Sequence, residues 1–133
     1  MFRFVLYRHG PYSFDVQADL EEMRSYGAIE IEPNTQGYGV VLNPGPMADF
    51  LQGMENVDPD ELKAINDVCA FVGHRNILEL ERLATASWIR TQEGVSDSAS
   101  VAKRLHALKP QVRITDAQEA VVTVESWFHD KTE

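Results

Sequence analysis

The stretch SFDVQADLEEMRSYG, residues 13–27, carries the clearest helical signal in the N-terminal part of the chain. Ser13 is a favourable N-cap, Asp15 suits the positive end of a helix, and Gly27 is placed to end it. Apolar residues recur between these signals at the spacing of one helix face. The pattern predicts a helix over residues 14–26.

β-type patterns lie on both sides of this predicted helix. Residues 2–7 alternate between the two faces of a half-buried strand, and Gly10 followed by Pro11 breaks the alternation. After the helix, residues 28–32 and 38–42 flank a turn rich in Gly, Pro and Asn. The order of strand, helix and β-hairpin predicts a winged-helix-like unit.

From residue 46 the hydrophobic period changes from two to 3.6, which predicts helices to the end of the chain. The expected helices are a short one at 46–53, one from Pro59 to about His74, one capped by Asn76 and ended by Gly94, one ended by Pro110, and one capped by Thr115. The inner face of the helix after Asn76 is expected to carry Leu80, Leu83, Ala84, Ser87 and Trp88. We therefore predict a single α+β domain over 1–133, with a winged-helix-like part at 1–45 and a bundle of four or five helices at 46–133.

Composition narrows the class of protein. The chain has 133 residues with 44% hydrophobic content, which is enough for one domain with its own core. Its single cysteine, Cys69, excludes an intramolecular disulfide, and its apolar flanks predict core packing. The sequence shows neither a basic leader nor the run of about 20 apolar residues that a membrane helix needs. We expect a cytoplasmic protein without membrane contact.

The net charge of −9 is concentrated in the N-terminal half. Residues 1–60 hold three Lys and Arg against ten Asp and Glu, whereas residues 61–133 hold nine against eleven. An acidic surface repels phosphate backbones and attracts basic partners.

Several stretches of the chain resemble a known family. LYRHGPYS at residues 6–13, followed by an acidic helix that ends in YGAI at 26–29, resembles the YGPYS segment of the YwgA-like, phage-associated uncharacterised proteins. Residues 78–86 and 101–110 are similar to the C-terminal helices of that family. The resemblance implies a winged helix followed by a helical cap. It implies no reaction, because the family has no established chemistry.

Members of that family usually begin with a helix ahead of the first strand, whereas this sequence begins at the strand itself. A winged helix normally buries its sheet against that first helix. We expect the cover to come from the C-terminal helices, from residues that would precede Met1, or from a partner or second copy.

Arg8-His9-Gly10 after a strand resembles the phosphohistidine signature of histidine phosphatases, with His74 as a second histidine. In such an enzyme His9 would attack phosphorus, and Arg8 and Arg24 would neutralise phosphate oxygens. That fold needs strands alternating with helices, whereas residues 46–128 predict helices alone. Surface residues at a strand end are therefore the favoured interpretation, and the phosphatase stays a remote alternative.

No cofactor, metal site or catalytic group is predicted. The histidines lie far apart in sequence and lack the close carboxylate or cysteine spacing of a metal site. Asp15, Asp19 and Glu22 share one helix face, but a solvated acidic face explains them better than a bound cation.

We therefore predict a non-enzymatic interaction protein, antitoxin-like or a regulatory accessory protein, with an acidic face that binds a basic protein partner. A homodimer is a further expectation. The predicted partner-binding residues are Tyr12, Asp15, Asp19, Glu22, Tyr26 and Tyr38.

The alternative is a winged-helix transcriptional regulator. The predicted recognition helix at 14–26 is acidic, so DNA would have to contact basic residues of the C-terminal half. These candidate DNA contacts are Arg82, Arg90, Lys103, Arg104, Lys109 and Arg113. Nucleic acid is the less favoured partner because the chain is acidic overall.

Overall fold

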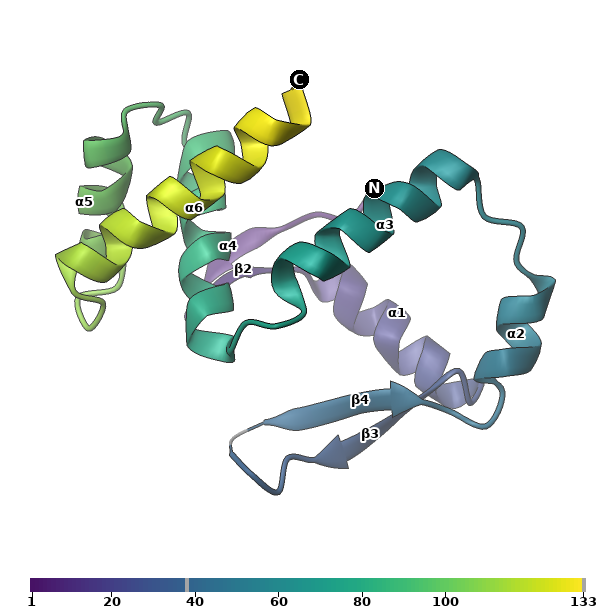
Figure 1. Ribbon diagram of the computed structural model, residues 1–133. Coiled ribbons are helices and arrows are strands. Elements are labelled where there is room, and N and C mark those ends of the chain that lie inside the picture. Colours follow the sequence, from purple (N-terminus) through teal and green to yellow (C-terminus); the bar gives the residue numbers. More distant parts are fainter. Residues whose placement is uncertain (38, 133) are drawn as a thin grey trace. The chain divides into compact units, whose positions relative to one another are not determined.

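The computed structural model describes residues 1–37 and 39–132. The elements in chain order are β1 Val5–Tyr7, β2 Gly10–Tyr12, α1 Phe14–Ser25, β3 Ile29–Pro33, β4 Val40–Pro44, α2 Ala48–Met54, α3 Pro59–Val72, α4 Ile77–Thr91, α5 Ser98–Leu108 and α6 Ile114–Thr132 (Figure 1). They form two compact units. The first unit comprises residues 1–4 and 13–67, and the second comprises residues 5–12 and 68–133.

In the first unit, α1 begins and ends where its capping residues dictate. The hydroxyl of Ser13 accepts a hydrogen bond from the Val16 N–H at 3.2 Å. After Ser25 the chain turns at Gly27, whose φ of +75° favours glycine. The hairpin β3–β4 starts directly after this turn.

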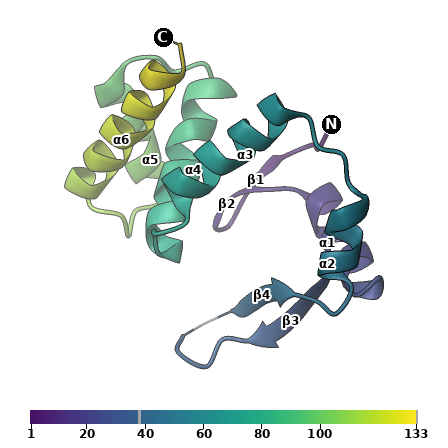
Figure 2. The same cartoon turned by 45° about the vertical axis from the view of Figure 1, so that its right-hand side comes forward.

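The hairpin is tied back to the turn after α1 by its own backbone. The Gly45 N–H donates to the Ala28 carbonyl at 2.9 Å, and the Met47 N–H donates to the Gly27 carbonyl at 2.9 Å. A Cβ at Gly45 would collide with the Gly27 carbonyl, so the two chain segments approach each other as closely as they do because residue 45 has no side chain. Figure 2 shows the hairpin running out from the C-terminal end of α1.

In the second unit, α4, α5 and α6 pack against one another and enclose the hydrophobic core of the molecule (Figures 1 and 2). Short and β-branched side chains fill the helix crossings, which lets the three helices approach closely. The buried apolar residues are Leu83, Ala86, Ile89, Val101, Ala102, Leu105, Val112, Ala117, Ala120, Val121 and Val124.

The β1–β2 hairpin belongs to the same unit and contacts α4. Gly10 is buried with a φ of +118°, and a Cβ there would lie 3.1 Å from the Thr85 hydroxyl oxygen. Lys109 is only 4% exposed, and its ammonium lies 3.3 Å from the Arg8 carbonyl oxygen and 3.5 Å from the Glu81 carboxylate. A buried charge needs such partners, so Lys109 fixes the turn of this hairpin to the helices.

The α+β class and the order of strand, helix, hairpin and C-terminal helices are confirmed. The sheet differs from that of a winged helix, because β1 pairs with β2, and the described residues form two separate two-stranded sheets. Gly10 and Pro11, expected to break the first strand, form the return strand of a tight hairpin. The helical bundle comprises α4–α6, and the sequence-based division at residue 45 falls inside the first unit.

Three local predictions were wrong. On α4 the buried residues are Leu83, Thr85, Ala86 and Ile89, while Ala84 is exposed. Thr115 is the second residue of α6 and not its cap, because the backbone carbonyl of Arg113 already accepts the Ala117 N–H. Cys69 is exposed and not in the core.

Candidate protein-interaction surface

The two units differ completely in charge. The first unit holds twelve Asp and Glu side chains against three Lys and Arg, a net charge of −9. The second unit holds nine of each and is neutral. The whole net charge of the protein therefore lies on the first unit.

The acidic face of α1 is the part of this unit that the sequence predicts as a binding surface. Asp15, Asp19, Glu22 and Tyr26 follow one another at helical spacing on one face. The Arg3 N–H donates to the Asp15 carboxylate at 2.9 Å, and the Arg3 guanidinium lies 4.0 Å from it. Asp19 forms no hydrogen bond or ion pair with any described residue, so its carboxylate faces solvent.

Tyr26 lies on the same face of α1 and is held there by a hydrogen bond. Its hydroxyl donates a hydrogen bond to the Glu22 carboxylate at 2.6 Å, and this bond raises the pKa of Tyr26. The ring stays exposed beside the carboxylates. Such a face offers a partner a negative charge next to an aromatic surface, which suits a cationic side chain.

Most carboxylates of the first unit lack an internal partner. Seven exposed carboxylates accept no hydrogen bond and form no ion pair within the described residues, and they come from α1, β3, α2, the segment after α2, and α3. They are Asp19, Glu30, Glu32, Asp49, Glu55, Asp60 and Glu61. Their negative charge is therefore balanced only by solvent ions or by another molecule.

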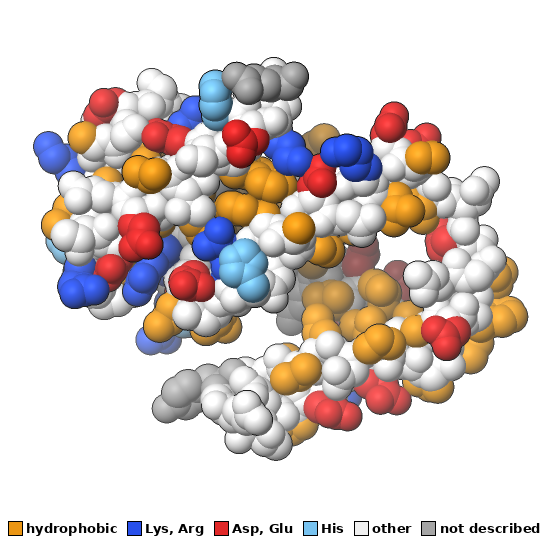
Figure 3. Space-filling model, viewed as in Figure 1, with side chains coloured by type: hydrophobic (Ala, Val, Ile, Leu, Met, Phe, Trp, Pro, Cys, Tyr) orange, Lys and Arg blue, Asp and Glu red, His pale blue; other side chains and the backbone are white. Residues whose placement is uncertain are grey.

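The first unit also lacks an apolar core. Among its described residues only Ser13 is buried. Large apolar side chains stand exposed on α1, β4, α2 and α3, and Figure 3 shows many of them over the hairpin and α2. They include Phe14, Met23, Tyr26, Val40, Val41, Leu42, Met47, Phe50, Met54, Leu62 and Ile65. A surface that combines exposed apolar groups with polar surroundings is typical of a binding site for another macromolecule.

The predicted DNA-contacting residues, all in the second unit, are mostly engaged within the protein. Four of the six form ion pairs: Arg82 with Asp116 at 4.0 Å, Arg90 with Glu125 at 3.2 Å, Arg104 with Glu93 at 2.9 Å, and Arg113 with Asp116 at 3.0 Å. Lys109 is buried against the β1–β2 turn, and Lys103 is exposed. Paired and buried cations attract phosphate less than free ones, which weighs against a DNA surface here.

Two predicted partner-binding tyrosines do not belong to the described acidic face. Tyr12 lies in β2 of the second unit, half-buried, with its ring centroid 5.7 Å from that of Tyr7. Tyr38 lies outside the described residues. The structure therefore brings together Asp15, Asp19, Glu22 and Tyr26.

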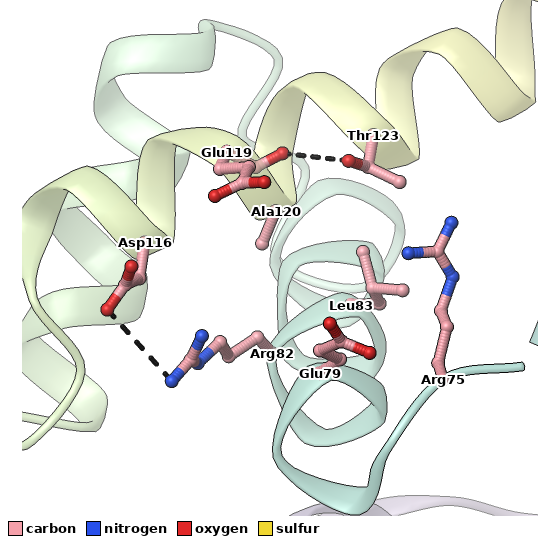
Figure 4. A pocket seen from close by; sticks show the side chains of 8 residues that line it. All are labelled: Arg75, Glu79, Arg82, Leu83, Asp116, Glu119, Ala120 and Thr123. Atoms are coloured by element: carbon pink, nitrogen blue, oxygen red, sulfur yellow. Dashed lines mark hydrogen bonds and ion pairs between the residues drawn. The ribbon is translucent and has the colours of Figure 1, made fainter.

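A polar hollow of about 70 Å³ lies between α4 and α6 of the second unit (Figure 4). Arg82 and Arg75 stand on opposite sides of Glu79 in this view, and Glu79, Asp116 and Glu119 contribute carboxylates. The Arg113 side chain, through its hydrogen bonds to the Asp116 carboxylate, lowers the pKa of that group. The hollow is far below the several hundred Å³ of a typical ligand pocket, so it has room for solvent and not for a substrate.

The histidines of the remote phosphatase alternative, His9 and His74, share no hydrogen bond or ion pair in the described residues. The exposed His9 ring lies 3.3 Å from the Glu81 carboxylate. No group of three His, Cys, Asp or Glu side chains in the described part of the chain could hold a metal ion. None of the described helices is long and apolar enough to cross a membrane.

No family model, curated protein or solved structure matches the chain. The resemblance to the YwgA-like proteins stays a prediction that rests on the stretches 6–13, 26–29, 78–86 and 101–110.

Sequence reasoning missed most of the unpaired carboxylates because it considered α1 alone. One simple signal could have found them: residues 25–62 contain no Lys, Arg or His, although they contain seven Asp and Glu. Carboxylates in such a stretch have no cationic neighbour at short range in sequence. The acidic surface therefore extends beyond α1 over the whole first unit.

Proposed function

We propose that this protein is a non-enzymatic interaction protein whose first unit binds a basic protein partner. One observation carries the proposal: the unit that holds the entire net charge of −9 is also the unit without a buried apolar side chain in its described residues. The second unit, which is neutral and has a packed core, acts as the scaffold.

The physical reason is that the first unit exposes apolar side chains without cover and carboxylates without cationic partners. Exposed apolar side chains gain about 25 cal/mol per Å² when a partner removes them from water. Unpaired carboxylates around them gain from a cationic rim on that partner, and they would repel acidic partners and nucleic acid. A protein with apolar groups surrounded by Lys and Arg is the complementary molecule.

The proposal is tested by capture from an extract of the native cells on the immobilised protein, with nuclease-treated and untreated extract in parallel. We expect a defined basic protein to be captured in both, and less of it as the salt concentration rises from about 0.01 M to 0.15 M, because the Debye length falls from about 30 to 8 Å. The double variant Asp19→Asn with Glu22→Gln is expected to weaken capture about fivefold or more.

A matched control removes the same charge from the second unit by Glu119→Gln with Asp130→Asn, and it is expected to leave capture unchanged. Equal loss of capture in both double variants would mean that total charge, and not the α1 face, attracts the partner. Capture of nuclease-sensitive nucleic acid alone would overturn the proposal in favour of a DNA-binding regulator.

A further inference from the structure

The hairpin β3–β4 leaves one of its edges unprotected. Neither strand pairs with any other strand in the described part of the chain. An open edge of this kind attracts further strands, and proteins usually block it with charged side chains or bulges. β4 carries neither of these over Val40–Asn43, where Val40 is 62%, Val41 41% and Leu42 48% exposed.

The register fixes which backbone groups of β4 point outward. The bonds from the Gly45 N–H to the Ala28 carbonyl and from the Asn34 N–H to the Gly39 carbonyl mark hydrogen-bonded pairs at the two ends of the ladder. Because such pairs alternate along an antiparallel ladder, Val41 and Asn43 face β3 with their backbone groups. The N–H and carbonyl groups of Val40 and Leu42 therefore face the open edge.

The side chains alternate in the same way. Val40 and Leu42 share a face of the hairpin with Ile31, which pairs with Leu42. Val41 lies on the opposite face, in register with Glu32 and next to the Glu30–Asn43 pair. Val41 is thus an apolar residue on an otherwise polar face.

We propose that a second copy of this chain pairs with the β4 edge, antiparallel and about a two-fold axis at Val41. In this register Val40 of each copy lies opposite Leu42 of the other, and the four outward N–H and carbonyl pairs form four backbone hydrogen bonds. The two Val41 side chains meet at the axis, which removes the exposed apolar residue from the polar face. The product is a four-stranded sheet with one apolar face.

Charged side chains make the β3 edge less suitable than the β4 edge for pairing with a second copy of the chain. The same two-fold pairing along β3 would place Glu30 directly opposite its own copy, and like charges in that position are destabilising. Pro33 also lacks an N–H for that edge. Along β4 no charged side chain opposes another. This contact does not use the acidic α1 face, so the double variant Asp19→Asn with Glu22→Gln is expected to leave it unchanged.

The first test is the oligomeric state of the full chain by sedimentation and light scattering over a range of concentrations, where we expect a dimer. Val41→Lys places two ammonium groups at the axis and is expected to weaken dimerisation at least about tenfold. Within one copy the new lysine lies opposite Glu32, so the hairpin itself gains an ion pair and the variant folds.

The register is tested by disulfide formation in a Cys69→Ser background. Val41→Cys is expected to form an interchain disulfide on mild oxidation, because residues opposite each other in a non-hydrogen-bonded pair have Cα atoms about 4.5 Å apart. Val40→Cys is the matched control and is expected to form no interchain disulfide, since residue 40 lies opposite Leu42 of the other copy. A wild-type monomer at all concentrations, or a disulfide through residue 40 and not 41, would overturn the proposal.

Discussion

Asp116 illustrates how a single side chain near the start of α6 links two helices. It accepts hydrogen bonds from the Arg113 guanidinium at 3.0 and 3.2 Å, and the Arg82 guanidinium of α4 lies 4.0 Å away. These contacts lower the pKa of Asp116, with the hydrogen bonds from Arg113 as the largest cause. A lowered folded-state pKa means that the contribution to stability is complete above the ordinary aspartate pKa of about 3.9 and is lost as the pH falls through the lowered value.

We therefore predict that Asp116→Asn lowers the melting temperature at neutral pH, and that its difference from the wild type shrinks toward zero as the pH falls below about 4. Thermal unfolding followed by circular dichroism across this pH range measures both effects. Asp130→Asn, at the exposed end of α6, is the control. A difference between wild type and Asp116→Asn that is constant with pH would show that ionisation of Asp116 does not stabilise the fold.

At this scale the sequence predicts capping well, because a cap depends on neighbours two or three residues away. Ser13 and Asn76 cap the helices they were expected to cap. Burial of single residues is a different matter, because it depends on partners far along the chain. From the sequence, Lys109 is predicted to be a surface cation, yet its ammonium contacts the carbonyl of Arg8, 101 residues away. The same limit explains why Cys69 was placed in the core and is exposed.

At the scale of elements, α4 begins with a complete capping box. The Asn76 side chain accepts from the Glu79 N–H at 2.9 Å, and the Glu79 carboxylate accepts from the Asn76 N–H at 3.0 Å. Asn76→Ala is expected to lower the free energy of unfolding by about 1 kcal/mol, whereas Asn76→Asp keeps the acceptor and most of the stability. Urea titration of both variants measures the difference, and equal losses in the two would argue against the cap as the cause.

Helices were easier to predict from the sequence than strands and inner faces. The helix bounds follow from local caps and glycines, whereas β1–β2 was missed because Gly10-Pro11 is usually a strand breaker. Here a Cβ at Gly10 would lie 3.1 Å from the Thr85 hydroxyl oxygen of α4, which is a tight contact, and the φ of +118° favours glycine, so packing and backbone conformation against the helix decide the outcome. The inner face of α4 was misjudged because its buried residues include the small Ala86 and the polar Thr85, whose hydroxyl donates to the Glu81 carbonyl.

At the scale of the whole molecule, the two units are expected to differ in the free energy of local opening. The helices α4–α6 bury a contiguous core, whereas the first unit buries no apolar side chain among its described residues. In hydrogen exchange on the full chain, we predict that amides of α1 and β3–β4 exchange at least about tenfold faster than those of α4–α6. Addition of the captured partner should slow exchange in α1.

Uniform protection across both units would contradict this prediction and would mean that the first unit opens only with the core. The sequence does not predict this difference in stability between the two units. Leu62 and Ile65 of α3 have the spacing of a buried face, yet both are exposed. Periodicity reports which residues share a face, but it does not report what covers that face. The acidic part of the candidate site was predictable in outline. The number of charged side chains in a stretch of sequence does not depend on how the chain folds.

The buried contact between Lys109 and the β1–β2 turn also constrains the order in which the protein can assemble during its synthesis. Residues 5–12 are synthesised before their partners Glu81, Thr85 and Lys109, and the whole stretch 13–67 of the first unit lies between them. The nascent chain must hold this short hairpin unattached while the entire first unit is translated, and it must then close a loop of about 100 residues. The hairpin β1–β2 can therefore complete its contacts only after a residue about 100 positions later in the chain has been made.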